Sequence, residues 1–470
     1  MSVPHMETPT NAMPHGIVKG WIIIAIAAVL AIAMYNTLPY DQNANKGLSL
    51  LLFIGILWLT EAIHITITAL LVPVLVVLFG MPFGTGDDLK PITTTQALRT
   101  FADPTIFLFF GGFALATALH MQQLDRKIAM YIVSMSGGHL GVAVLAIFAV
   151  TAGLSMWISN TATAAMMLPL ALGLLSHMDS KKDRGTFVFI LLGIAYSASI
   201  GGMGTMVGSP PNAIAARALD YDFADWMKVG LPMMALMMPV MLLALYVVLR
   251  PKLNVKVEFK AENIPWTHMR VTTMVLFVCT AVAWIFGKSL TDAFGISQPD
   301  TWVAILAACL IVILGIAKWQ DIVDNTDWGV LMLFGGGLTL SAAMGASGTS
   351  LVLGQTLAGW LGDASPLVII FAVAAFIIFL TEFTSNTASA ALLVPVFGAI
   401  AVEMGMPKEI LVVVIGIGAS CAFMLPVATP PNAIVFGTGH IKQSEMMKVG
   451  FVLNILSTVV VASFIYWFFS

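Results

Sequence analysis

The chain has 470 residues, of which 59% belong to the apolar and aromatic set AVILMFWYC and only 10% are charged, and its formal net charge is −3. Soluble domains carry about 25% charged residues, so this composition excludes a water-soluble globular protein. The net charge is small and no basic tract occurs, so nothing favours nucleic acid as a partner. The three cysteines form neither a disulfide framework nor a metal-binding pattern. We therefore expect an all-α polytopic membrane protein with the lipid bilayer as its solvent.

Apolar runs follow one another along almost the whole chain, and a run of about 20 residues is long enough to cross a bilayer once. The first, 18–38, is too long for the apolar core of a signal peptide and is interpreted as a crossing. The others are 48–63, 65–80, 104–124, 140–176, 187–219, 228–249, 271–289, 301–317, 328–345, 366–402, 410–439 and 446–469.

Two of these runs, 140–176 and 366–402, are nearly twice the usual length and carry Ser-Asn-Thr in the middle. We expect each to form a re-entrant helical hairpin that turns at this polar tip, which leaves eleven transmembrane helices. With the N-terminus in the cytoplasm, the cytoplasmic segments hold 14 Lys and Arg residues and the outer segments hold 7. This asymmetry follows the positive-inside rule and places the C-terminus outside.

The chain also contains an internal repeat, because four motifs recur in the same order and at nearly the same offset along the chain. They are Phe-Gly-Gly at 110–112 and 334–336, SNTATAAMMLP and SNTASAALLVP at 159–169 and 385–395, SPPNAI and TPPNAI at 209–214 and 429–434, and MKVG at 227–230 and 447–450.

This repeat predicts four parts: 1–47 with the first helix, a first repeat 48–250, a cytoplasmic linker 251–270, and a second repeat 271–470. Each repeat holds five crossings and one hairpin. Since five is odd, the second repeat enters the membrane from the opposite side. Inverted repeats with interrupted helices are typical of secondary transporters, whose substrate site lies where the repeats meet.

Each Pro-Pro-Asn must break an apolar helix, because proline removes a backbone donor and clashes with the preceding turn. Ser209 and Thr429 are placed to cap the helices that restart at Pro210 and Pro430. The two Ser-Asn-Thr tips should cap two further half-helices in the same way. We expect the four helix N-termini to converge, where their partial charges of roughly +0.5 each suit a divalent anion. The carbonyl groups freed at the breaks, with Asn and Ser/Thr oxygens, suit a small monovalent cation.

No lysine or arginine occurs in the Ser-Asn-Thr or Pro-Pro-Asn motifs, and the nearest, Arg217, is interpreted as an interfacial residue. A bound dianion must then be balanced by helix dipoles, hydroxyl groups and cations, which gives a physical basis for coupling. Glu382 is an intramembrane carboxylate before the second tip, where the first repeat has Met156. A functional role and a hydrogen-bonded structural role both stay open for it.

Paired Ser-Asn-Thr motifs, each followed by Ser/Thr-Pro-Pro-Asn-Ala, resemble the divalent anion/sodium symporter family, in particular its bacterial INDY-type sodium/dicarboxylate symporters. The resemblance implies a homodimer in the bacterial cytoplasmic (inner) membrane, with a transport domain that moves against a scaffold as an elevator. It implies sodium-coupled uptake of C4-dicarboxylates such as succinate, fumarate or malate, with Na+ as the co-transported ion.

The same resemblance implies the residues of three sites. The first sodium site would use Ser155, Ser159, Asn160 and Gly208. The second would use Thr381, Thr384, Asn386 and Ala428. The substrate would contact Asn160, Thr161, Asn386, Thr387, Thr429 and Pro430.

Other functions are weighed against this one. An ion channel would need rings of polar residues along an open pore, and an enzyme would need a nucleophile with a base within reach. Neither pattern accompanies the repeated motifs, so we expect no enzymatic activity. Among transporters, a sodium-independent dicarboxylate exchanger and a citrate or sulfate carrier of the same fold stay open.

Overall fold

The computed structural model describes residues 15–84, 89–176, 178–256, 264–361 and 364–469. This part of the chain is mostly helical, with one short antiparallel pair of strands, β1 (Pro82–Phe83) and β2 (Lys90–Pro91). The helices up to residue 250 are α1 (His15–Thr37), α2 (Gln42–Thr60), α3 (Ile65–Leu78), α4 (Thr94–Arg99), the 3-10 helix η2 (Thr100–Ala102), α5 (Pro104–Met121), α6 (Leu124–Ser134), α7 (Leu140–Ser155), α8 (Asn160–Leu175), α9 (Arg184–Gly202), α10 (Pro210–Ala218) and α11 (Phe223–Leu249).

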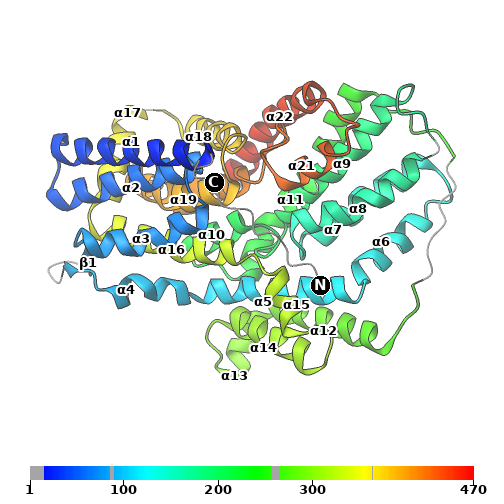
Figure 1. Ribbon diagram of the computed structural model, residues 1–470, viewed down its shortest axis with the longest axis horizontal. Coiled ribbons are helices and arrows are strands. Elements are labelled where there is room, and N and C mark those ends of the chain that lie inside the picture. Colours follow the sequence, from blue (N-terminus) through cyan, green and yellow to red (C-terminus); the bar gives the residue numbers. More distant parts are fainter. Residues whose placement is uncertain (1–14, 85–88, 177, 257–263, 362–363, 470) are drawn as a thin grey trace, which may run out of the picture.

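The helices after the linker are α12 (His268–Ile285), α13 (Gly287–Phe294), α14 (Pro299–Ile313), α15 (Trp319–Asn325), α16 (Trp328–Ala346), α17 (Thr349–Leu361), α18 (Pro366–Leu380), α19 (Asn386–Glu403), α20 (Lys408–Gly418), α21 (Pro430–Phe436) and α22 (Gln443–Phe469). In Figure 1 the helices of both halves form one helical body, in which α1 and α2 lie at one end and α9, α21 and α22 lie toward the other.

The number of spanning helices agrees only coarsely with the sequence. Within the described residues, nine helices are long and apolar enough to cross a membrane, or ten if the bent pair α13–α14 forms one span. The predicted eleven differ because they include α3, with 14 residues, and α20, with 11 residues, and treat α19 as a hairpin arm. The structure confirms a mostly helical polytopic membrane protein. The count of eleven and the re-entrant nature of the hairpins stay predictions.

Helices that occupy equivalent places in the two halves pack reciprocally. The Phe-Gly-Gly motifs lie on α5 and α16, and α5 packs against α14 while α16 packs against α3. Likewise, α10 packs against α19, and its counterpart α21 packs against α8. Each contact therefore recurs with the roles of the two halves exchanged. Such exchange is what two repeats related by a twofold axis produce.

The helix contacts form two groups. In the first group, α1 packs on α2, α2 on α3, α3 on α16, and α5 on α14 and α15. In the second, α9 contacts α7, α8, α11 and α21, while α22 contacts α11, α18 and α20. The groups meet where α10 and α19 contact α16, where α17 and α2 contact α19, and where α11 contacts α12 and the start of α14.

The helices that lead into the two breaks are the most enclosed. In α9 every residue from Thr186 to Gly202 is buried, and in α20 the same holds from Ile410 to Gly418. A helix that is apolar on all sides belongs in an interior. By contrast, α1 is largely exposed, as a helix in contact with lipid is. Because α9 and α20 end inside the molecule, they place the breaks there.

The Phe-Gly-Gly glycines allow close packing of neighbouring helices. A Cβ atom on Gly111 of α5 would lie 2.6 Å from the carbonyl oxygen of Ala304 in α14. One on Gly336 of α16 would lie 2.5 Å from the carbonyl oxygen of Ala69 in α3. A side chain at either place would force helix backbones apart.

We predict that Gly111→Ala lowers the free energy of unfolding by about 1–3 kcal/mol, because backbone must shift to admit the methyl group. Gly153→Ala is the matched control, since a Cβ there meets nothing within 4 Å. It should leave stability unchanged or raise it by about 0.5–1 kcal/mol, because alanine favours a helix interior over glycine. The check is the thermal unfolding midpoint of each purified variant, and equal midpoints would contradict the packing argument.

Candidate cation and anion site

All four expected half-helices begin where the sequence placed them. We call 159–161 and 385–387 tips 1 and 2, and 210–212 and 430–432 breaks 1 and 2. Ser159 and Ser385 cap α8 and α19, since their Oγ atoms accept from the backbone nitrogens of Ala162 (3.3 Å) and Ala388 (3.4 Å). Thr429 caps α21 in the same way. Ser209 has the N-cap position of α10 but accepts no capping bond.

The asparagine side chain of each break donates hydrogen bonds to backbone carbonyl oxygens that the break leaves without helical partners. Nδ2 of Asn212 donates to the carbonyl oxygens of Gly202 (2.8 Å) and Thr205 (2.7 Å). Nδ2 of Asn432 donates to the carbonyl oxygens of Ala422 (3.1 Å) and Leu425 (3.0 Å). Both side chains are fully buried. The same pair of bonds, to carbonyls at matching positions before the asparagine, therefore holds both unwound segments.

An oxygen-rich cluster forms between tip 1 and break 1. Oγ of Ser155 lies 2.6 Å from Oδ1 of Asn160 and 2.7 Å from the carbonyl oxygen of Ala198. The same end of the Asn160 amide lies 3.0 Å from the Ala198 oxygen and 3.3 Å from the carbonyl oxygen of Gly208. If the amide nitrogen occupies that end, it donates to these carbonyls. If the amide oxygen occupies it, several oxygens face one another, an arrangement that a bound cation stabilises.

Two glycines allow the Asn160 side chain and the backbone carbonyl groups to come this close together. A Cβ atom on Gly202 would overlap Oδ1 of Asn160. One on Gly208 would lie 2.5 Å from the carbonyl oxygen of Gly202 and 2.9 Å from that of Ser155. The structure therefore brings together three of the four residues expected in the first sodium site. The fourth, Ser159, directs its hydroxyl oxygen to the start of α8.

The second cluster is related but less complete. Oγ1 of Thr381 lies 2.5 Å from Oδ1 of Asn386 and 3.1 Å from the carbonyl oxygen of Ala419. Thr384 pairs its hydroxyl with Ser389 at 2.7 Å. Ala428 is buried, and no hydrogen bond among the described residues joins it to Thr381 or Asn386.

The residue three positions before each tip is hydrogen-bonded to the unwound segment of the same half. In the first half a side chain of the unwound segment makes the bond, and in the second half the side chain comes from the residue before the tip. In the first, Oγ1 of Thr205 donates to the carbonyl oxygen of Met156 and accepts from the nitrogen of Gly208 (3.1 Å). In the second, the place of Met156 is taken by Glu382, which is 1% exposed. Its carboxylate accepts from three successive backbone nitrogens and from Nδ2 of Asn454; the partners are Phe423 (2.7 Å), Met424 (2.9 Å), Leu425 (3.1 Å) and Asn454 (2.7 Å).

Of the two roles left open for Glu382, the structure favours the hydrogen-bonded one. It is a positioning residue for the segment between α20 and break 2. No sequence signal pointed to Thr205, Ala198 or Ala419, because two of these take part through backbone oxygens and none is repeated in a motif.

The two unwound segments meet in the buried interior. Oγ of Ser209 lies 3.2 Å from Oγ of Ser420, and the Tyr196 hydroxyl donates to the carbonyl oxygen of Phe423 (2.6 Å). Because α10 packs on α19 and α21 on α8, each restarted helix lies beside the tip helix of the other half. Among the expected substrate contacts, Thr161 and Pro430 are exposed, Asn160, Asn386 and Thr387 are half-buried, and Thr429 is buried.

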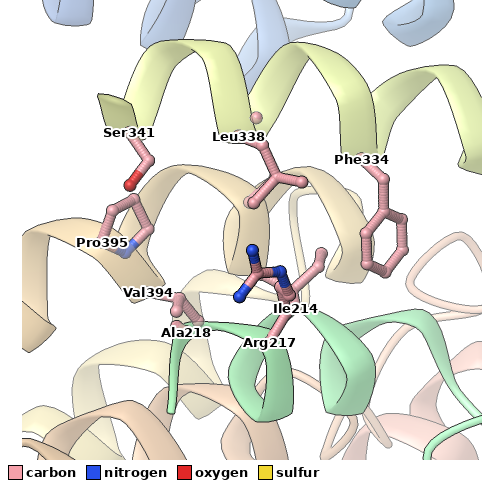
Figure 2. Close-up of a pocket in the computed structure, with 10 residues that line it drawn as sticks. Ile214, Arg217, Ala218, Phe334, Leu338, Ser341, Val394 and Pro395 are labelled. Carbon is pink, nitrogen blue, oxygen red and sulfur yellow. The ribbon is translucent and has the colours of Figure 1, made fainter. Parts of the chain in front are cut away.

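A separate cavity lies between α10, α16 and α19, lined by Ile214, Arg217, Phe334, Leu338, Ser341 and Val394 among others (Figure 2). Its volume of about 60 Å³ is far below the roughly 300–1,000 Å³ of small-molecule sites. Arg217 is half-exposed and ion-paired with Asp103, which agrees with its interpretation as an end residue.

We predict that Glu382→Gln lowers the unfolding free energy by about 1–3 kcal/mol, because a neutral amide offers one acceptor oxygen to four donors. The unwound segment would then hold its carbonyl groups less firmly, so the sodium concentration needed for half-maximal binding should rise. Thermal unfolding and sodium titration of the purified protein measure the two effects. Glu403→Gln, at an exposed carboxylate of α19, is the control. An unchanged sodium titration in Glu382→Gln would exclude the positioning role.

The protein family described as "Sodium:sulfate symporter transmembrane region" matches residues 17–470 of this chain. An uncharacterized transporter of Haemophilus influenzae is 55% identical over 96% of this chain and 97% of its own length. The sodium-dependent dicarboxylate transporter SdcS of Staphylococcus saprophyticus is 32% identical over 96% of this chain and 91% of its own.

Among solved structures, the YdaH transporter of Alcanivorax borkumensis has a similar fold, with a TM-score of 0.58 and 15% identity over 86% of this chain and 99% of that one. The family match over residues 17–470 and the SdcS relative confirm the family that the motifs resembled. This chain is a transporter and not an enzyme, and it belongs to the sodium:sulfate symporter family, the divalent anion/sodium symporters that its motifs resembled.

Proposed function

We propose that this protein is a secondary active transporter that takes up C4-dicarboxylates, such as succinate, fumarate and malate, together with sodium. The co-transported ion is sodium, the cation named in the family description and in the SdcS relatives. The observation that carries the proposal is the position of the two oxygen clusters, each beside the start of a half-helix.

The two clusters serve as the sodium sites. The first comprises Ser155, Ser159, Asn160 and Gly208, with the Ala198 carbonyl as an additional ligand. The second comprises Thr381, Thr384, Asn386 and Ala428, with the carbonyl of Ala419. Neutral hydroxyl, amide and carbonyl oxygens suit a hard monovalent cation.

The dicarboxylate binds between the two clusters. One carboxylate contacts Asn160 and Thr161 at tip 1 and the other contacts Asn386 and Thr387 at tip 2, with Thr429 and Pro430 at break 2 beside them. Backbone N–H groups at helix starts are ready anion sites because four of them lack partners within the helix. The two asparagines belong to both the cation and the anion sites, so they link the occupancy of one to that of the other.

The two helix groups serve as a scaffold (α1–α5 and α12–α16) and a transport unit (α7–α11 and α18–α22) in an elevator mechanism. The eleven crossings, the two re-entrant hairpins and the inverted repeat belong to this proposal. So do a homodimer, the bacterial inner membrane, a cytoplasmic N-terminus and an outer C-terminus. Its support is the reciprocal packing of the two halves.

A second candidate function is favoured by the family description, which names sulfate. A sulfate or citrate carrier, or a sodium-independent dicarboxylate exchanger, would use the same fold. Competition by sulfate and citrate in the binding assay below separates the first two from a dicarboxylate carrier.

We predict that Asn160→Ala and Asn386→Ala each remove most uptake without unfolding the protein. Each substitution deletes an oxygen from a cation site and a donor from the anion site. Ser134→Ala is the control, because Ser134 is exposed and donates only to the Tyr131 carbonyl. The measurement is uptake of labelled succinate into proteoliposomes at matched protein content. Near-normal uptake by either asparagine variant would remove its tip from the site.

We also predict that sodium and succinate raise each other's affinity by the same factor, since linkage is reciprocal. The expected factor is about 5 to 150, which corresponds to a coupling of about 1–3 kcal/mol. Tryptophan fluorescence of the purified protein, titrated with succinate in sodium and in choline, measures it. Equal succinate affinity in the two salts would reject sodium symport and favour the exchanger.

A further inference from the structure

The two halves of the molecule differ in how their restarted helices contact the scaffold. In the first half, Ala213 and Ile214 of α10 pack against Ile106 and Phe109 of α5 and against Val330, Leu331 and Phe334 of α16. Ala213 is fully buried in this contact. In the second half, Ala433 occupies the place of Ala213 and is exposed, and α21 contributes nothing to this cluster among the described residues. Thus α10 is docked on the scaffold, whereas the matching face of α21 is not.

An ion pair fastens the docked helix. Nε of Arg217, one residue before the end of α10, donates to Oδ2 of Asp103 at 2.9 Å. The other carboxylate oxygen of Asp103 caps α5 by accepting from the nitrogen of Thr105 (3.0 Å). The Asp103 side chain is 9% exposed and that of Arg217 is 39% exposed, so water screens the pair only in part. Figure 2 shows Arg217 rising from α10 toward α16.

The second half keeps the acceptor of this pair and lacks the donor. Asp327 precedes Phe334 at the same spacing at which Asp103 precedes Phe110, and it caps α16 by accepting from the nitrogen of Val330 (3.1 Å). The place of Arg217 after the Pro-Pro-Asn motif is taken by Gly437.

The apolar part of the docking face is retained, since Ala433 and Ile434 match Ala213 and Ile214. Docking of α21 on the scaffold would therefore keep the apolar contact and lack the ion pair.

We propose that the Arg217–Asp103 pair is a latch that stabilises the end state in which α10 is docked over the state in which α21 is docked. The proposal rests on the elevator mechanism of the preceding section, in which the two repeats exchange conformations between the end states. In the exchanged state Arg217 leaves Asp103 but keeps Asp220, to which its Nη1 donates at 2.8 Å. The separation therefore exposes no unpaired guanidinium, and the latch biases the two states without blocking their exchange.

The test measures how often the exchanged state is visited. A cysteine pair at Asp327 and Gly437, in a chain without the three native cysteines, reports α21 docking through its rate of disulfide formation with copper phenanthroline in proteoliposomes. Asp103→Asn removes the charge but keeps a residue that caps helices well, and Arg217→Gln removes the other charge. We expect each variant to raise the cross-linking rate about fivefold, the upper range for a partly exposed ion pair.

The double variant Asp103→Asn/Arg217→Gln discriminates the latch from a general loosening. Because both substitutions remove the same interaction, the double variant should cross-link no faster than either single one. Additive increases, or unchanged rates in all three variants, would overturn the proposal.

The control is Asp220→Asn, which changes the exposed partner of Arg217 and leaves the Asp103 pair intact, so its rate should not rise above that of the parent chain. Succinate binding in sodium and in choline, measured on the same variants, distinguishes failure of the latch from failure of sodium symport. If sodium dependence persists while the rates contradict the latch, the latch fails and symport stands. If sodium dependence is absent in the parent chain, symport fails.

Discussion

Backbone N–H and C=O groups released inside an apolar core have no water to bond, and each destabilises the fold by several kcal/mol unless another group takes the place of water. The two proline breaks create this problem at the ends of the most enclosed helices, α9 and α20. Asn212 and Asn432 compensate for the lost helical bonds, because each donates the same pair of hydrogen bonds to preceding carbonyl oxygens. Once those carbonyls are held, the unwound segments can bring further carbonyl oxygens to tips 1 and 2. The oxygen clusters depend on this solution.

The two halves solve the remaining part of the problem differently. Thr205 reaches from the unwound segment to the backbone of Met156, just before tip 1. Glu382, just before tip 2, accepts from three backbone nitrogens of the other unwound segment. Both connections fix the distance between a tip and its break. A carboxylate can hold more donors than a hydroxyl, which suits the longer segment between Gly418 and Pro430 compared with that between Gly202 and Pro210. Duplicated motifs therefore do not imply identical contacts.

The sequence predicts those helix starts that depend on the local residue types. Proline pairs break helices wherever they stand, and Ser before Asn-Thr caps a helix, so the starts of α8, α10, α19 and α21 follow from residue types alone. It could not find ligands that act through the backbone, such as the carbonyls of Ala198 and Ala419, because any residue type supplies a carbonyl. It also could not pair Arg217 with Asp103, since these residues lie far apart in the chain and only packing joins them. Crossing number is weakly determined because short helices such as α3 and broken ones such as α20–α21 do not match the bilayer length.

Under the proposed function, the charges around the tips and breaks give a reason why an anion would need cations to bind there. Arg217 of α10 is directed to Asp103 and Asp220. Glu382 adds no positive charge, because it is an acid whose carboxyl oxygens accept from three backbone nitrogens. Each of the four helix starts offers only a partial charge of roughly +0.5. No full positive charge is therefore fixed beside a dicarboxylate bound there. Under the proposed function, sodium ions in the oxygen clusters supply that charge from solution, so the requirement for the co-transported ion follows from the absence of a fixed one.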